Sequence, residues 1–410
     1  MGIPKRLFPA CLLLVLLGPT PAWSAEVRFR SSTQYLWYQD LIAADKEKSL
    51  QDAAQYLRIN VTNIDKAGDI NVYAYGRATK QVNTSQDLEG RLYYLYLDYR
   101  NVVKERLDLR AGRTYVNAAA ISGTVDGFHA DVKNLGPVGV TLFGGRHVIF
   151  DEKREIGKGG DALAGMSVYL DTIKNTHVEV SYGRKYGENY GDSDLMRENV
   201  GLDFSTTPFG MVNFYGRLKY DTMSEVYNEM LFGAKVSPVK DLTLRGEYYE
   251  SYPTFDAASI YSVFSVNQYK EASVTAEYQL TSKYRVSLKY AREIFDGDSN
   301  ANVYEVGFLA KPIKDLTLNL IYEYREGYAG QLSGIRFYGE YKIAKASVLA
   351  GIDYDDFRRQ LSREGSAKRY WAGVNYAINK SLSAVLRVED NQNFNYDNSY
   401  QGYAAIQFNY

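Results

Sequence analysis

The 410-residue sequence predicts an all-β fold, a transmembrane antiparallel β-barrel of about 22 strands, with 20 as the lower count. Three observations lead to this prediction. Nearly the whole chain alternates apolar and polar residues in stretches of about 10 residues. Short and long connections between these stretches take turns along the chain. The first 25 residues have the layout of an export signal.

The alternation is clearest in residues 241–248, 284–293 and 382–389. In the second of these, Leu288 and Tyr290 fall on one face, and Lys289 falls on the other. Side chains of a strand point alternately to the two faces of its sheet, so each strand has an apolar face and a charged face. A soluble β-sandwich alternates in the same way, so the alternation alone does not separate the two folds.

The connections favour the membrane barrel. Tight turns are expected at residues 65–69, 134–139, 206–210, 237–241, 281–283, 311–315 and 379–381. Longer polar or glycine-rich stretches lie between them, at 151–161, 186–195, 252–267, 295–301, 355–367 and 390–398. Short periplasmic turns at one rim and longer extracellular loops at the other are typical of outer-membrane barrels. The sheet must close into a barrel, because hydrocarbon offers no hydrogen-bond partner to the backbone groups at an open sheet edge.

Residues 1–25 are predicted to be a signal peptide, and residues 26–410 a single barrel domain. Lys5 and Arg6 precede an apolar run, residues 7–17, which is shorter than the roughly 20 residues of a spanning helix. The only cysteine, Cys11, lies in that run, so the mature chain has no disulfide, thiolate metal site or covalent haem site, and no cofactor is expected. Loss of Lys5 and Arg6 makes a slightly acidic chain more acidic, which argues against nucleic-acid binding.

The last eleven residues alternate up to the C-terminus, with Ile406, Phe408 and Tyr410 on one face. This pattern resembles the terminal strand of bacterial outer-membrane barrels, which ends in an aromatic residue and is read by the barrel-assembly machinery. The resemblance implies a location in the bacterial outer membrane. It also implies outer-membrane lipid and the assembly machinery as partners, with Phe408 and Tyr410 as the assembly signal.

The charged faces are expected to line the lumen, because barrels of 16 or more strands are too wide for their own side chains to fill. The candidates for lumen-lining residues are Arg113, Asp126, Arg245, Glu247, Arg285, Lys289, Glu293, Asn319, Glu323, Arg387 and Glu389. Both signs of charge occur among them. Two interpretations stay open: a polar passage without strong charge preference, or ion pairs that only solvate the wall.

Gly112-Arg113 and Asp126-Gly127 flank a loop of small residues, 118–123. This arrangement resembles a Gly-Arg and Asp-Gly pairing in several porin-like barrels, where neighbouring strands carry an inward arginine and an inward aspartate. The resemblance implies a contact between Arg113 and Asp126 in the lumen. A purely structural tether is the alternative interpretation.

The longest connection, 252–267, is apolar for a loop and contains Phe255, Ile260, Tyr261 and Phe264. Folded inward it would constrict the lumen, and left outward it would offer a docking surface. The three histidines, His129, His147 and His177, fall on separate strands without metal-ligand spacing. The sequence predicts neither a metal site nor an enzyme.

Two functions are compatible with these features. The first is a porin-like channel that forms a hydrophilic passage for small solutes. The alternative is the barrel sheath of a porin–cytochrome conduit, which holds multihaem c-type cytochromes for electron transfer across the outer membrane. The size, the 38 tyrosines and the start of the strands near Val27, which leaves no plug domain, resemble such conduit barrels.

Overall fold

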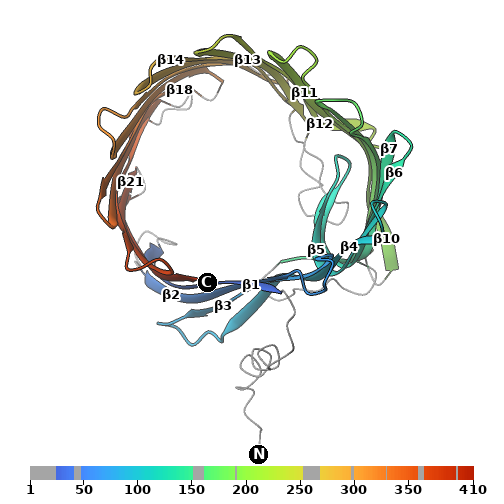
Figure 1. The fold of residues 1–410 in the computed structure, drawn as a ribbon. Helices are drawn as coiled ribbons and strands as arrows, with labels where there is room; N and C mark the ends of the chain where they lie inside the picture. Colours follow the sequence, from blue (N-terminus) through green and yellow to red (C-terminus); the bar gives the residue numbers. More distant parts are fainter. Residues whose placement is uncertain are drawn as a thin grey trace, which may run out of the picture.

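The computed structural model describes residues 25–40, 48–150, 161–189, 192–252, 268–296, 300–328, 330–358, 364–393 and 396–410. These residues form one sheet of 22 antiparallel strands that closes into a ring (Figure 1). The predicted all-β barrel of about 22 strands is therefore confirmed. Residues 1–24 of the predicted signal peptide lie outside the described residues, and so do Phe255, Ile260, Tyr261 and Phe264 of the 252–267 loop. In the described part of the chain, no helix is long and apolar enough to cross a membrane.

The strands of the first half are β1 (Glu26–Asp40), β2 (Lys48–Thr62), β3 (Ile70–Gln81), β4 (Glu89–Val103), β5 (Leu107–Asn117), β6 (Ser122–Leu135), β7 (Val138–Val148), β8 (Ala162–Leu170), β9 (Thr176–Asn189), β10 (Asp192–Thr206) and β11 (Val212–Asp221). The strands of the second half are β12 (Val226–Val239), β13 (Leu242–Ser251), β14 (Tyr269–Thr281), β15 (Tyr284–Phe295), β16 (Ala301–Ala310), β17 (Leu316–Gly327), β18 (Gln331–Ile343), β19 (Ala346–Arg358), β20 (Glu364–Ala377), β21 (Leu382–Asn393) and β22 (Tyr396–Asn409). Each strand pairs with its neighbours in sequence.

The barrel closes where β1 pairs with β22, which we call the seam. The register runs from Arg30 opposite Asn409 to Tyr38 opposite Gln401. At the end of the seam, the N–H of Phe29 donates to the carbonyl of Tyr410 at 2.9 Å, and the N–H of Tyr410 donates to the carbonyl of Phe29 at 2.8 Å. The last residue of the chain thus completes the ladder, and neither terminal strand is left as a free edge.

The two rims of the barrel differ in their connections. One rim, which we call the turn rim, holds Glu26, Tyr410 and the short turns, such as 104–106, 136–137 and 240–241. At the opposite rim, the loop rim, strands continue into several stretches predicted as loops. β9 and β10 take up most of 186–195 and leave two residues between them, and β21 and β22 do the same at 394–395. Paired ribbons satisfy their own backbone groups, so these polar segments need not be irregular.

The inner and outer faces of the wall can be assigned from a hairpin that lies inside the ring, made of β5 and β6 (Figure 1). Its tip bonds to Ser181 on β9 and Asn199 on β10, so these side chains point inward. Val180 and Val200 have the opposite parity and are 52% and 40% exposed, on the outer face. Register partners share a face, which carries this assignment around the barrel. Most apolar residues of the other strands then face outward and most charged residues inward, although Arg184, Glu198 and Arg292 have the outward parity.

Candidate functional site

The hairpin of β5 and β6 leaves the barrel wall part-way along its length. β5 pairs with β4 only as far as Arg113, which lies opposite Leu95. Beyond that point β5 pairs with β6 alone, out to Asn117 opposite Ser122. β6 in turn pairs with β7 only from Thr124 onward. The free end of the hairpin, with residues 118–121 at its tip, is the blue-green hairpin inside the ring in Figure 1.

The tip of this hairpin is hydrogen-bonded to the inner wall. The N–H of Ala120 donates to the Ser181 hydroxyl at 2.8 Å, and the Asn199 amide donates to the Ala120 carbonyl at 2.9 Å. The N–H of Ala119 donates to the Glu179 carboxylate at 3.2 Å. Ala120 and Asn199 are completely buried. Side chains of β9 and β10 therefore satisfy backbone groups that the turn itself leaves unbonded.

A small apolar core holds the hairpin against the same side of the wall. It consists of Val116, Ala118, Ile121 and Val125 from the hairpin, with Phe143 from β7 and Leu163 from β8. All six are buried, although they lie in the interior of a barrel whose inner face carries many charged residues. Full burial of a side chain such as valine or leucine stabilises a fold by about 1.5–3 kcal/mol. The core and the hydrogen bonds together keep the hairpin inside the lumen.

Two glycines of the wall allow the tip to approach this closely. A Cβ atom on Gly201 would lie 2.2 Å from the nitrogen of Ala120, and one on Gly183 would lie 2.1 Å from Cγ2 of Ile121. Both distances are shorter than any tolerated contact of a carbon atom, so a side chain at either position would displace the tip. Wall and hairpin are thus matched in shape.

Arg113 and Asp126 meet at the base of the hairpin. Nε and Nη2 of Arg113 donate to Oδ1 and Oδ2 of Asp126 at 2.7 and 2.8 Å, and Nη1 donates to the carbonyl of Leu92 at 2.9 Å. Arg113 is only 7% exposed. Leu92 belongs to the part of β4 that β5 no longer pairs with, so Arg113 bonds a carbonyl at the split between these strands. This geometry is that of a structural tether, and a role of the pair in lining the passage stays a prediction.

The other charged candidates lie on the inner face and form ion pairs. Arg245 and Glu247 approach to 3.6 Å and Arg387 and Glu389 to 3.0 Å, each pair on one strand. The remaining pairs join neighbouring or nearby strands, and they are Arg285 with Glu277 (3.9 Å), Lys289 with Glu271 (3.4 Å), Arg325 with Glu293 (2.7 Å) and Arg336 with Glu323 (2.8 Å). Asn319 faces Leu309 and Tyr338 in the register. Arg285, Lys289 and Glu293 therefore take partners on other strands rather than one another.

The sequence interpretation missed two groups of inner-face residues. The first is the set that receives the hairpin, Glu179, Ser181 and Asn199, which carries no local sequence signal. The second is a cluster of arginines and tyrosines on β1 to β4. Alternating Arg28 and Arg30 hint at it, but only the register shows which residues of β2 stand opposite them.

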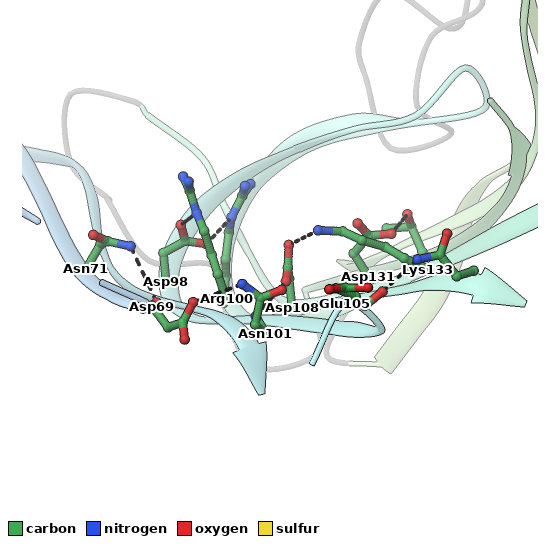
Figure 2. A network of polar contacts seen from close by, with 12 residues as sticks. Asp69, Asn71, Asp98, Arg100, Asn101, Glu105, Asp108, Asp131 and Lys133 are labelled. Carbon is green, nitrogen blue, oxygen red and sulfur yellow. Dashed lines mark hydrogen bonds and ion pairs between the residues drawn. The ribbon is translucent and has the colours of Figure 1, made fainter. Parts of the chain in front are cut away.

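A network of polar contacts ties neighbouring strands together at the turn rim (Figure 2). Asp98 has a side chain that is only 3% exposed, and it accepts hydrogen bonds from Nε of Arg100 and Nε of Arg110, both at 2.9 Å. Lys133 forms an ion pair with Asp108, and Nδ2 of Asn101 donates to Asp69 at 2.9 Å. These contacts fix the strands that carry the base of the hairpin.

The adjacent turn, residues 63–69, is closed by its own carboxylate. The N–H of Ile70 donates to Asp65 at 2.8 Å, and this bond lowers the pKa of the Asp65 carboxyl below its usual value. Within the described ranges, no group of three or more His, Cys, Asp or Glu side chains is arranged to hold a metal ion.

Fold and site together define a closed 22-stranded antiparallel β-barrel with a charged inner face and an inward hairpin. No protein-family model and no curated protein matches the chain. Solved structures of the same architecture include the outer membrane protein OpdK from Pseudomonas aeruginosa, with a TM-score of 0.49 and 10% identity, covering 94% of this chain and 98% of that one. The P pilus usher PapC translocation pore gives 0.49 and 8%, covering 93% and 99%. A BenF-like porin from Pseudomonas fluorescens Pf-5 gives 0.45 and 9%, covering 94% and 98%. At these values the likeness concerns the barrel fold alone.

Proposed function

We propose that this chain forms a water-filled channel through the bacterial outer membrane for small hydrophilic solutes. The observation that carries the proposal is the division of the wall into an outer face of mainly apolar residues and a charged inner face. Leu288, Val306 and Val274 on the outer face are 52%, 47% and 59% exposed. A continuous apolar surface of this kind is not stable in water, and a bilayer is the surrounding that suits it.

The inner face supports a passage for water and ions. Its arginines and carboxylates alternate around the second half of the barrel and leave part of their surfaces exposed, for example 44% and 27% for the side chains of Arg245 and Glu247. A barrel of this strand number encloses more space than its own side chains fill. The inward hairpin takes up part of that space from one side, and we propose that it narrows the passage.

The membrane orientation follows from the two rims. We propose that the turn rim faces the periplasm and that the loop rim, with its protruding ribbons, faces the exterior. Phe408 and Tyr410 end at the turn rim and are 39% and 78% exposed. That exposure supports the proposal that these aromatic residues are recognised by the barrel-assembly machinery.

The alternative is a sheath around multihaem c-type cytochromes. The inward hairpin weighs against it, because the hairpin is anchored by buried contacts inside the space that an enclosed partner would have to occupy. No contact of the described residues favours a haem protein over water as the content of the lumen.

Conductance measurements on the purified full-length protein test the proposal. In planar lipid bilayers, the haem-free barrel should produce discrete, ohmic current steps in potassium chloride. Absorbance in the Soret region, recorded on material purified from its native membranes, reports any bound haem protein. A folded barrel that co-purifies with a haem protein, and that conducts no ions either with it bound or after its removal, would overturn the channel and favour the sheath.

A further inference from the structure

The inner wall beside the seam carries arginines that face one another. Arg30 on β1 lies directly opposite Arg58 on β2, and Arg77 on β3 lies directly opposite Arg91 on β4. Like charges at directly opposed positions of neighbouring strands destabilise the pairing. For Arg30 and Arg58 this arrangement costs free energy, and an anion between their guanidinium groups would offset that cost.

On the other side of the barrel, inner-face arginines form ion pairs with carboxylates. Arg217 lies 2.8 Å from Asp203, and Arg325 lies 2.7 Å from Glu293. By contrast, no carboxylate of the described residues lies within ion-pair distance of Arg58. Among the described residues, Arg30 has only a hydrogen bond from its Nε to the Asn409 side chain, at 2.6 Å. Within the described part of the chain, the positive charges of Arg30 and Arg58 are therefore not neutralised by ion pairs with carboxylates.

Tyrosine rings hold one of these arginines in place. The guanidinium carbon of Arg58 lies 5.2 Å from the ring centre of Tyr75 and 5.8 Å from that of Tyr94. Tyr75 in turn stacks on Tyr93 with 4.8 Å between ring centres. Stacking on a ring face stabilises a guanidinium group without using its N–H donors. Arg58 is thus positioned while its N–H groups stay available for a ligand.

A pocket of about 440 Å³ lies at this place on the inner wall. Arg30, Arg58, Tyr56, Tyr75, Ser32 and Gln407 are among the residues that line it. The volume falls within the range of small-molecule sites. The lining offers guanidinium, hydroxyl and amide donors together with two aromatic rings, and it includes no carboxylate.

We infer that this seam pocket binds small organic carboxylates that pass through the barrel. A guanidinium group bonds a carboxylate through two parallel, charge-assisted hydrogen bonds, and the tyrosine rings provide an apolar surface for the organic part. A bound carboxylate also relieves the repulsion between Arg30 and Arg58. The inference rests on the proposed channel and adds the class of solute that its inner wall binds, which is small organic carboxylates.

The test compares Arg58→Gln with Arg245→Gln. Arg245 is a matched control because it also faces a basic residue, Lys235, across the strands, yet it has Glu247 within 3.6 Å. In planar bilayers, benzoate should reduce the chloride current through the unmodified barrel in a saturable way. The Arg58→Gln variant should need at least about tenfold more benzoate, because it loses the charge-assisted hydrogen bonds of the guanidinium group. The Arg245→Gln variant should be blocked like the unmodified barrel.

Benzoate binding to the detergent-solubilised barrel, measured by calorimetry, separates this inference from the proposed function because it needs no conductance. Equal benzoate affinity for the unmodified barrel and the Arg58→Gln variant would overturn the seam pocket and leave the channel intact. Inorganic phosphate that blocks or binds as well as benzoate would overturn the preference for organic carboxylates. A folded barrel that binds benzoate through Arg58 without conducting would support the pocket while overturning the channel.

Discussion

Arg113 donates two parallel hydrogen bonds to Asp126, at 2.7 and 2.8 Å, and a third to the carbonyl of Leu92 at 2.9 Å. One side chain thereby joins β4, β5 and β6 at the point where the hairpin turns away from the wall. Without Arg113, the Leu92 carbonyl would lose a partner where the β4–β5 ladder has already ended. Arg113 thus gives the Leu92 carbonyl a hydrogen-bond partner at the point where β5 separates from β4.

Replacing Asp126 with Asn should destabilise the barrel, because Arg113, at 7% exposure, would lose the negative charge of Asp126. We expect a loss of about 1.5–3 kcal/mol, the range for a hydrogen bond to a charged group. Urea unfolding in detergent, followed by tryptophan fluorescence, measures this loss. Asp353→Asn is the control, because its partner Arg369 has a side chain that is 44% exposed and such pairs contribute about 1 kcal/mol or less. Equal losses in the two variants would contradict the tether.

Replacing Gly201 with Ala should release the tip of the hairpin, since the new Cβ would lie 2.2 Å from the nitrogen of Ala120. A displaced hairpin leaves a wider passage, so the single-channel conductance should rise. Gly246→Ala is the matched control, because a Cβ atom at Gly246 has no neighbour within 4 Å. If both variants fold and conduct like the unmodified barrel, the hairpin does not narrow the channel.

Removing Tyr410 should weaken closure of the barrel, because both backbone hydrogen bonds to Phe29 depend on the last residue. Tyr410→Phe keeps these bonds and an aromatic side chain, and it should therefore close normally. The fraction of protein that migrates as a compact band in unheated gel samples measures closure after refolding in detergent. An equally compact deletion variant would show that the end of the seam contributes little.

Cysteines introduced at successive positions of β15 should differ in their reaction with a water-soluble maleimide. Lys289 pairs with Glu271 on the inner face, whereas Leu288 is 52% exposed on the outer face. In liposomes, Lys289→Cys should react quickly and Leu288→Cys should be protected by lipid. The single cysteine of the sequence, Cys11, lies in the predicted signal peptide, so labelling is specific once that segment is cleaved. Equal protection of both positions would contradict a water-filled lumen.

The sequence by itself determined the barrel, the strand number to within two and the apolar and charged faces. These features depend on side-chain period and on connections, which are local properties of the chain. The contact between Arg113 and Asp126 was expected from a resemblance to the Gly-Arg and Asp-Gly pairing of porin-like barrels, and the structure joins the two residues across one hairpin. The sequence interpretation overestimated the loops at 186–195 and 390–398, since polarity alone does not separate a loop from a protruding ribbon whose strands bond each other.

The tertiary structure alone decided two features. The hairpin turns inward because Ala120 finds Ser181 and Asn199 on strands about 60 and 80 residues away, and no local pattern encodes such contacts. Arg30 meets Arg58 because the register of β1 against β2 is fixed across the whole strand pair, and a shift by one residue would turn one of them outward. The alternation of side chains along each strand sets which residues face the lumen. The pairing register of neighbouring strands and long-range packing set which of these residues are in contact there.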